Sequence, residues 1–251
     1  MNEPAPEPGL RPDSPPAGSF TVVVGAARAL ARALLELVYP PRCAACGAPV
    51  AAEPFCAVCA EAIEPVPAGC ARCGLPGPAD PCLACRAAPP SFDELRAGGL
   101  FGGPLADAIH AFKYEHRPAL ARPLGAWLAS RVSVPRGVAI VSVPLGRARR
   151  LERGYDQAAL LAEALARAAG ARRLRGAIRR TRETPPQVGR SRAERAANVA
   201  GAFAADGSVS GLELALVDDV VTTGATAAAA AAALKEAGAK RVIVLAIARA
   251  E

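Results

Sequence analysis

Four CxxC pairs within 43 residues constrain the fold of this chain more than any other feature of its sequence. The segment that holds them is rich in proline and glycine and has few long apolar runs, so hydrophobic burial alone cannot stabilise it. A CxxC turn places two thiolates within reach of one tetrahedral zinc ion, at about 2.3 Å per bond, and two such turns complete a four-thiolate site. We therefore predict structural zinc at Cys43, Cys46, Cys56, Cys59, Cys70, Cys73, Cys82 and Cys85.

The cysteine segment also contains an internal repeat. CAACG at 43–47 matches CARCG at 70–74, and CAVC at 56–59 matches CLAC at 82–85. The offsets of 27 and 26 residues favour two tandem zinc sites, one built from the first four cysteines and one from the last four. Interleaved pairing of the CxxC turns is the alternative.

Two other uses of these cysteines fit the sequence less well. Disulfides suit an even number of cysteines, but only in an exported chain. A redox dithiol would use a single CxxC at a helix start rather than four in succession. Four thiolates around each metal leave no position for water, so the predicted zinc ions hold structure and take no part in catalysis.

The net charge of +7 is concentrated in one region. Residues 145–195 contain 14 arginines and 5 acidic residues, whereas the rest of the chain has a small acidic excess. Such a local excess suggests binding of a polyanion: a phosphate, a pyrophosphate or a nucleic acid. A solvated, arginine-rich surface is the alternative.

The N-terminal region carries no signal-peptide pattern. Residues 1–19 are rich in proline and are expected to form a flexible tail. Residues 20–38 are apolar enough to suggest a membrane span, but Arg28, Arg32 and Glu36 form a polar stripe that a bilayer centre disfavours. We expect an amphipathic helix that packs on the protein, with a helix lying on a membrane surface as the alternative. The absence of a transmembrane segment indicates a cytoplasmic protein.

After the double zinc ribbon predicted at 39–88, strands alternate with helices. Short apolar runs predict buried strands at 138–143, 213–220 and 241–248, with a further strand near 92–101. Helices are predicted at 104–114, from Pro123, near 155–169 and at 225–237. This alternation predicts an α/β domain at 89–251, with a mostly parallel sheet and helices on both faces. The basic loop 144–154 and the loop after 213–220 then lie at the carboxyl edge, where such sheets bind ligands.

The stretch VDDVVTTGAT, residues 217–226, carries the strongest indication of a ligand site. Asp218 and Asp219 follow an apolar strand, and carboxylates there can bind sugar hydroxyls or help to hold Mg²⁺. Thr222–Thr226 begins a helix, whose amides and dipole favour a phosphate, and Gly224 permits close approach. This predicts a ligand with a diol and a phosphate, such as a ribose 5-phosphate. A simple helix cap is the alternative, but it needs only one such residue.

VDDVVTTGAT resembles the phosphoribosyl pyrophosphate signature of type I phosphoribosyltransferases, and the full layout resembles the ComF family of competence-associated proteins. Further landmarks are YPPRCAACG at 39–47, AFKY at 111–114, SVPLGRARRLERGYDQAALLA at 142–162 and PPQVGRSRAERAANVAGAF at 185–203. The resemblance covers about residues 34–249. It implies a Rossmann-like type I phosphoribosyltransferase domain preceded by a double zinc ribbon.

The resemblance also implies roles for individual residues. Asp218 and Asp219 would contact the ribose hydroxyls and the Mg²⁺-bound substrate, and Arg149 and Arg153 would lie near the pyrophosphate; these four are the candidate catalytic residues. The implied set that binds phosphoribosyl pyrophosphate is Asp218, Asp219, Val220, Val221, Thr222, Thr223, Gly224, Ala225, Thr226 and Lys113. Gln157, Gln187, Arg195 and Asn198 match other family motif positions without an assigned role.

Two positions depart from the family pattern. The family commonly reads RGFNQ where this chain has RGYDQ, so that Asp156 replaces an amide with an acid. An acid is unfavourable beside a pyrophosphate, so we expect Asp156 to point away or to reach Mg²⁺. The family loop often carries His-Pro where this chain has Gly146-Arg147.

The resemblance favours a phosphoribosyltransferase-fold protein that binds phosphoribosyl pyrophosphate with Mg²⁺ and contributes to DNA uptake in natural transformation. Three activities are compatible with it. The first is a phosphoribosyltransferase with an unknown acceptor, and the second is a sensor that binds phosphoribosyl pyrophosphate without turnover. The third is a factor for DNA uptake in natural transformation, which handles single-stranded DNA together with the uptake machinery. Aromatic residues that could stack on bases are few; the candidates are Tyr114, Tyr155 and Phe112. We expect His110 and His116 to be packed or at the surface rather than catalytic.

Overall fold

The computed structural model describes residues 40–51, 54–183 and 192–250, and the structural statements below concern these residues. The predicted tail at 1–19 and the predicted helix at 20–38 lie outside them. Among the described helices, none combines the length and the apolar character needed to cross a membrane.

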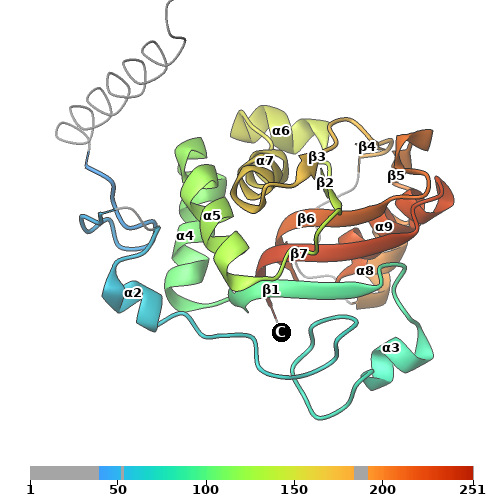
Figure 1. The fold of residues 1–251 in the computed structure, drawn as a ribbon, viewed down its shortest axis with the longest axis horizontal. Coiled ribbons are helices and arrows are strands. Elements are labelled where there is room, and N and C mark those ends of the chain that lie inside the picture. The colour runs from blue at the N-terminus through green and yellow to red at the C-terminus, as the bar shows by residue number, and fades with distance from the viewer. Residues whose placement is uncertain (1–39, 52–53, 184–191, 251) are drawn as a thin grey trace, which may run out of the picture. The chain divides into compact units, whose positions relative to one another are not determined.

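Five strands form one parallel sheet (Figure 1). In spatial order they are β1 (Glu94–Leu100), β7 (Arg241–Arg249), β6 (Glu213–Val221), β2 (Ala139–Ser142) and β3 (Arg172–Arg173). Every neighbouring pair is parallel, so the carboxyl ends of all five strands lie at one edge of the sheet. The predicted fold class, a parallel α/β sheet preceded by a cysteine-rich ribbon module, is confirmed.

Helices cover both faces of this sheet, as the alternation predicted. Along β7, Ile243 and Leu245 pack in one apolar cluster with α4, α5 and α7, whereas Val242 and Val244 pack in another with α9. The bounds of these helices are Gly103–Tyr114 for α4, Ala121–Arg131 for α5, Gln157–Ala169 for α7 and Ala225–Glu236 for α9. Successive side chains of a strand point to opposite faces, so a strand covered on both faces needs the continuous apolar run that the sequence shows.

Three boundaries differ from the sequence-based expectation. The basic segment 144–154 is not all loop, because α6 (Arg147–Arg153) occupies most of it. Helix α5 begins before Pro123, since a 3₁₀ turn at Pro118–Leu120 leads directly into it. Strand β6 includes both aspartates, as the predicted range 213–220 does, and ends one residue later, at Val221.

The remaining short elements lie beside the main sheet. β4 (Ile178–Arg180) and β5 (Phe203–Ala205) form an antiparallel pair. Helix α8 spans Arg192–Val199, and a second 3₁₀ turn spans Gly207–Val209. Ile178 and Phe203 join the apolar cluster on the α9 face, so this pair extends the cover of that face.

The internal repeat of the sequence is also a repeat in structure. Isolated bridges pair Arg42 with Pro49 and Gly69 with Pro76, at the same offset of 27 residues. Behind each first CxxC turn stands a glycine in the left-handed region, Gly47 at φ 75 and Gly74 at φ 65. The second CxxC pair of each repeat begins a short helix, α2 (Ala57–Glu61) or α3 (Leu83–Ala87).

The first ribbon shares an apolar cluster with α4 and α5. Cys43 and Phe55 are buried in this cluster, and the Phe55 ring meets the Trp127 ring edge-on with 5.6 Å between centroids. A Cβ atom on Gly98 of β1 would lie 2.5 Å from a carbon of the Trp127 ring. Gly98 therefore makes room for the ring that Phe55 packs against. The division of the chain into 39–88 and 89–251 stays a prediction.

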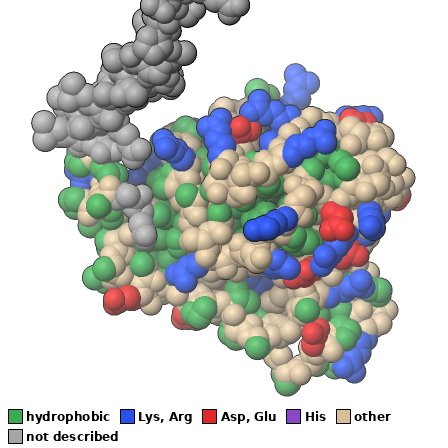
Figure 2. Space-filling model, in the orientation of Figure 1, with side chains coloured by type: hydrophobic (Ala, Val, Ile, Leu, Met, Phe, Trp, Pro, Cys, Tyr) green, Lys and Arg blue, Asp and Glu red, His purple; other side chains and the backbone are tan. Residues whose placement is uncertain are grey.

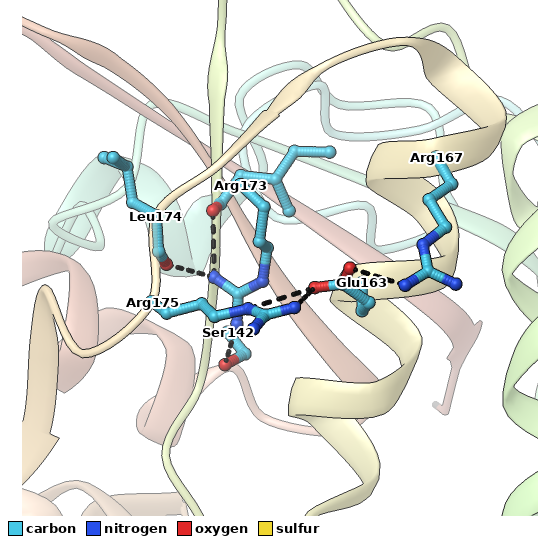
Figure 3. A network of polar contacts seen from close by, with 7 residues as sticks. Ser142, Glu163, Arg167, Arg173, Leu174 and Arg175 are labelled. Carbon is cyan, nitrogen blue, oxygen red and sulfur yellow. Dashed lines mark hydrogen bonds and ion pairs between the residues drawn. The ribbon is translucent and has the colours of Figure 1, made fainter.

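Part of the arginine excess holds the fold together (Figure 3). The Arg173 guanidinium donates to the Ile140 carbonyl at 3.0 Å and to the Ser142 hydroxyl at 2.9 Å, which fastens β3 to β2. In α7, Glu163 pairs with Arg167 at 3.1 Å and with Arg175 at 2.7 Å. The charge of these arginines is thus explained by contacts within the protein, and a polyanion ligand must be sought at others.

Candidate functional site

The eight cysteines form two groups of four, in the tandem pairing that the repeat favours. Within each group, 43/46/56/59 and 70/73/82/85, all sulfur atoms lie within 4.8 Å of one another. Cys46 and Cys56 are 3.7 Å apart at their Sγ atoms, and so are Cys73 and Cys82. A zinc tetrahedron with bonds of about 2.3 Å has sulfur–sulfur edges of about 3.8 Å. Both groups therefore fit a structural zinc ion.

The thiol acidities also favour a cation at each group. Burial raises the pKa of Cys43, but hydrogen bonds from the amides of Cys46 and Cys56 outweigh it and lower the pKa to about 6. The same balance lowers the pKa of Cys70 to about 6. Burial and neighbouring thiols raise the pKa of Cys59 and of Cys85. Four clustered sulfurs cannot all ionise without a cation, and a divalent zinc ion supplies that charge.

A pocket of about 190 Å³ opens at the carboxyl edge of the sheet, where β2 and β6 end. It brings together side chains from widely separated parts of the chain. The polar ones are Lys113 of α4, Arg149 and Arg153 of α6, Asp156 and Gln157 at the start of α7, Arg180 of β4, and Asp218, Asp219, Thr222 and Thr226. The basic segment and the stretch after LALV therefore form two walls of one cavity.

The two aspartates are held beside one lysine. Lys113 Nζ lies 2.8 Å from the Asp219 carboxylate, and both side chains are largely buried. The Asp218 carboxylate accepts a hydrogen bond from the Asp219 amide at 2.9 Å. Burial, and then the negative charge of Asp219, raise the pKa of Asp218 to about 7, although Lys113 opposes this. Two adjacent, partly buried acids are an arrangement that a divalent cation or sugar hydroxyls would stabilise.

The segment after the aspartates encloses a smaller cavity of about 30 Å³, lined by Asp218 and residues 220–227. Gly224 has φ 77 and is the N-cap of α9, where no side chain caps the helix. Thr223 Oγ1 accepts from the Ala225 amide at 3.4 Å, which is too long for a strong bond. The simple-cap interpretation is therefore not what the structure shows, and the first turn of α9 has the polarity that suits an anion.

The backbone conformation gives a reason for Gly224 in addition to close approach of a ligand. A Cβ atom there would meet the Phe92 ring only at an ordinary contact distance of 3.6 Å. Within the protein, a Cβ atom at this position would therefore find room. The constraint is the left-handed backbone at φ 77, which residues with a Cβ atom adopt only at a cost.

The opposite wall of the pocket is basic. Figure 2 shows Lys and Arg side chains gathered where α6 lies, and this helix carries Arg149 and Arg153, both of which line the pocket. The Arg153 guanidinium lies over the Tyr114 ring, 4.9 Å from its centroid. Arg180 also lines the pocket, from β4, and sequence reasoning missed it. No local motif marks Arg180; only its place in the arginine-rich region hinted at it.

Asp156 neither points away from the pocket nor needs a metal to explain it. Its carboxylate accepts from the Ala159 amide at 3.0 Å and so caps α7. It also accepts from the Leu145 amide at 3.2 Å and pairs with Arg150 at 3.1 Å. The acid that departs from the family pattern thus holds the segment after β2 onto the start of α7, with its charge compensated by Arg150.

Gln157 is the other residue of this motif that the structure explains. Its side chain is 1% exposed and lines the pocket, and its Nε2 has no hydrogen-bond partner among the residues that the structure describes. A buried donor without a partner is costly, so a ligand oxygen in this cavity is its natural acceptor. Of the other motif residues, Gln187 and the side chain of Arg195 lie outside the described part of the chain. The Asn198 carbonyl accepts from Arg182 at 3.1 Å.

Exposure decides which of the aromatic residues could stack on a base and where the two histidines lie. Phe112 is fully buried and Tyr155 bonds the Phe112 carbonyl through its hydroxyl, so neither offers a ring for stacking. Tyr114 is 54% exposed and stands beside Arg153. His110 and His116 are both exposed, in line with the surface positions expected for them.

Fold and site together define a class of protein: a parallel α/β sheet with a polar pocket at its carboxyl edge, preceded by two zinc ribbons. A family model described as a double zinc ribbon domain matches residues 34–88. The chain itself belongs to the family of competence protein F and DNA utilization protein YhgH. The ComF resemblance of the sequence is thereby confirmed.

Three relatives illustrate the extent of the match. DNA utilization protein YhgH of Salmonella typhi is 35% identical over 231 residues, which cover 85% of this chain and 99% of that protein. Competence protein F of Haemophilus influenzae is 32% identical over 220 residues, covering 83% and 90%. Competence protein ComFC of Streptococcus pneumoniae is 27% identical over 145 residues, covering 58% and 63%.

Among solved structures, the chain is similar to glutamine phosphoribosylpyrophosphate amidotransferase from B. subtilis in complex with ADP and GMP. The identity is 24% and the TM-score 0.37. The aligned part covers 53% of this chain and 26% of the amidotransferase, so this protein matches about a quarter of that enzyme.

Proposed function

We propose that this protein binds phosphoribosyl pyrophosphate together with Mg²⁺ at the carboxyl edge of its sheet, in a domain of the type I phosphoribosyltransferase kind. The observation that carries the proposal is the pocket itself. Its acidic strand end, its helix N-terminus and its basic wall face one cavity. Phosphoribosyl pyrophosphate has the matching groups: a ribose diol, a 5-phosphate and a pyrophosphate.

Each part of the ligand has a complementary group of residues in the pocket. The 5-phosphate suits the small cavity formed by 220–227, because helix amides and threonine hydroxyls can donate to its oxygens. The ribose hydroxyls suit the carboxylates of Asp218 and Asp219. The pyrophosphate suits the wall made by Arg149, Arg153 and Arg180, since guanidinium groups can grip two phosphate oxygens at once.

Mg²⁺ fits the same site. Asp218 and Asp219 supply the oxygen ligands that Mg²⁺ prefers, and the raised pKa of Asp218 reflects negative charge that a cation would offset. Once bound, Mg²⁺ would neutralise the pyrophosphate and make it a better leaving group. Lys113, which is 2.8 Å from Asp219, orients that carboxylate.

Binding is the proposed function, and transfer to an acceptor is a further step. A phosphoribosyltransferase would break the bond between the anomeric carbon and the pyrophosphate and release pyrophosphate when an acceptor attacks. A sensor would bind the same ligand and leave it intact. Pyrophosphate release in the presence of candidate acceptors separates these two outcomes.

Calorimetric titration of the zinc-loaded protein with phosphoribosyl pyrophosphate and Mg²⁺ tests the proposal. The wild type should bind, and the Asp218→Asn/Asp219→Asn double variant should lose at least tenfold in affinity, about 1.4 kcal/mol, because two carboxylates leave the site. An Asp206→Asn variant, altered at an exposed acid of the second 3₁₀ turn, should bind like wild type. Absence of binding by the wild type at millimolar ligand would refute the proposal.

A second candidate function, binding of single-stranded DNA, is favoured by one observation. Tyr114 is an exposed ring with Arg153 stacked on it at the pocket rim, and ring-plus-guanidinium pairs suit an unpaired base and its phosphate. The names of the relatives refer to competence and DNA utilization. In support of this candidate we propose a role in DNA uptake, exerted in the cytoplasm together with components of the uptake machinery, because thiols stay reduced in that compartment.

Salt dependence separates this candidate from sugar-phosphate binding. If an oligonucleotide bridges Tyr114 and the basic wall, its affinity should fall steeply between 50 and 200 mM salt, roughly tenfold per few phosphates contacted. Tyr114→Leu should weaken oligonucleotide binding more than phosphoribosyl pyrophosphate binding, because Tyr114 contacts the basic wall of the pocket only through Arg153. An oligonucleotide affinity that Tyr114→Leu does not change would argue against this surface.

A further inference from the structure

Arg249, the last residue of β7, is a buried arginine that the sequence did not single out. It is 5% exposed, although arginine is among the residues most rarely buried. Its Nε donates to the carbonyl of Cys73 at 3.1 Å. Its Nη1 donates to the carbonyls of Val221 at 3.2 Å and Thr222 at 2.5 Å.

These contacts join two parts of the protein that are far apart in sequence. Cys73 is a ligand residue of the second zinc group, and Val221 and Thr222 begin the segment that encloses the smaller cavity. Arg249 sits between them and bonds the backbone of both. The Ala250 amide adds a bond to the Val221 carbonyl at 2.9 Å, so the end of β7 is fastened to the end of β6 at this point.

A guanidinium is well suited to this task. Its planar group presents several N–H donors in fixed directions, so one side chain can hold two backbone segments at a set spacing. Bonds from a charged donor to carbonyls are stronger than neutral ones, and a buried site excludes competing water. The position of the Thr222 carbonyl fixes the peptide plane from which the phosphate-binding turn departs.

The first ribbon makes a different attachment. Its Phe55 packs on Trp127 of α5, and the carbonyl of Glu64, which follows this ribbon, accepts from the Leu100 amide at 2.8 Å. These contacts are to α5 and the end of β1, not to the segment 221–226. The two zinc groups, alike in sequence and geometry, thus have different neighbours, and this gives each experiment below an internal control.

We propose that the second zinc group orders the phosphate-binding segment 221–226 through Arg249. Zinc fixes the turn that carries the Cys73 carbonyl, this carbonyl fixes the Arg249 guanidinium, and Arg249 holds the Val221 and Thr222 carbonyls. Arg249 is therefore a positioning residue. The part of this inference that concerns ligand affinity rests on the proposed function, whereas the part that concerns order in the segment does not.

Hydrogen exchange of the whole zinc-loaded protein tests the order of the segment without any ligand. Cys82→Ser, in the second zinc group, should speed amide exchange in peptides covering 217–228 on the order of tenfold. Cys56→Ser, at the equivalent position of the first group, should not speed exchange in those peptides beyond any change seen in the rest of β7. Slow exchange in the rest of β7 serves as the check that the sheet is intact in both variants.

Arg249→Met then separates the arginine from the zinc. It should retain two zinc ions per chain by native mass spectrometry and still speed exchange in 217–228 on the order of tenfold. Arg241→Met is the matched control, since Arg241 lies at the other end of β7 and pairs with Glu94. In the double variant Arg249→Met/Cys82→Ser, the exchange effect should not exceed that of the larger single variant, because both changes interrupt one chain of contacts.

Ligand titration supplies the last readout. If the wild type binds phosphoribosyl pyrophosphate, Arg249→Met and Cys82→Ser should weaken binding about tenfold, and Arg241→Met and Cys56→Ser should not. Equal exchange in 217–228 for all four variants would overturn the inference even if the ligand binds. No binding by the wild type would refute the proposed function alone, because the exchange result still decides whether the second zinc group orders the segment.

Discussion

At the scale of single residues, Asp218 shows how a binding site conflicts with stability. Burial, and then the charge of Asp219, raise the pKa of Asp218 from its ordinary 3.8 to about 7. The folded protein therefore holds a proton that the unfolded chain releases. Ionisation of Asp218 costs stability, and this cost is complete above pH 7 and disappears as the pH falls below 4. Functional sites commonly retain such unfavourable groups.

Asp218→Asn should therefore stabilise the protein. We expect a gain of about 1–2 kcal/mol in the free energy of unfolding at pH 8, shrinking as the pH is lowered towards 4. Denaturant unfolding at pH 8, 6 and 4 measures it. Asp206→Asn is the control with the opposite expected effect on stability, because hydrogen bonds from Ser208 lower the pKa of Asp206. A loss of stability in Asp218→Asn at pH 8 would contradict the pKa argument.

Gln157 should contribute to the binding of the pyrophosphate part of the ligand only. Its Nε2 lines the pocket together with the basic wall and has no partner within the described part of the chain. Gln157→Leu should therefore weaken phosphoribosyl pyrophosphate binding about tenfold and leave ribose 5-phosphate binding nearly unchanged. Calorimetry with both ligands measures the split. An equal loss for both ligands would mean that Gln157 supports the whole pocket rather than the pyrophosphate.

At this scale, candidate site residues could be predicted from the sequence where they are contiguous in the chain. Asp218, Asp219 and the threonines form one motif and could be read directly. Arg180 and Arg249 could not, because each reaches its site through contacts between distant segments. Asp156 was noticed as unusual, but its role as the cap of α7 depends on where that helix begins.

At the scale of secondary structure, β1 shows how packing dictates residue choice. A strand of seven residues has glycine at both 98 and 99. The Trp127 ring occupies the space beside Gly98, and the Glu64 carbonyl lies 2.9 Å from a Cβ atom placed on Gly99. Glycine normally weakens a strand, so here close approach of α5 and of the segment after the first ribbon explains its presence.

Gly98→Ala should consequently be destabilising. A methyl group 2.5 Å from the Trp127 ring forces that ring to move, at a cost of about 1–3 kcal/mol in the free energy of unfolding. Thermal unfolding measures the loss. Adding Trp127→Leu should recover part of it, since the smaller side chain frees the space. If Gly98→Ala alone costs nothing, the ring has room that the structure does not show.

The elements themselves were predictable to different degrees. The buried strands β2, β6 and β7 were expected from apolar runs, because a strand covered on both faces needs such a run. Helix α6 was expected as loop, since RARRLER has no apolar stripe to reveal it. It has no buried residue, and glycines at 146 and 154 set its limits.

At the scale of the whole molecule, the two zinc groups hold different parts of the structure. The first is built into the apolar cluster of α4 and α5, where Cys43 is fully buried. The second forms a small cluster of its own, Cys70, Cys73, Cys82 and Cys85, and meets the sheet through Arg249. Loss of zinc should therefore have two distinguishable effects.

Trp127 is the only tryptophan of the chain and reports on the first group. Cys56→Ser should shift its fluorescence to longer wavelength, because Phe55 leaves the ring and water reaches it. The variant should also lose about 2–5 kcal/mol of stability, as expected for loss of a structural metal or crosslink. Cys82→Ser should leave the emission unchanged. The same shift in both variants would show that the two ribbons unfold together.

The sequence by itself determined the two zinc sites, the parallel α/β fold, the family and the acidic-threonine motif. All of these depend on local spacing or on a period along the chain, which a sequence displays directly. Only the tertiary structure decided which arginines hold the fold and which line the pocket. It also decided that Gly98 makes room for the Trp127 ring, and that Arg249 joins the second cysteine group to the segment 221–226. These depend on contacts between residues up to 176 positions apart, as between Cys73 and Arg249, and such contacts exist only once the chain has folded.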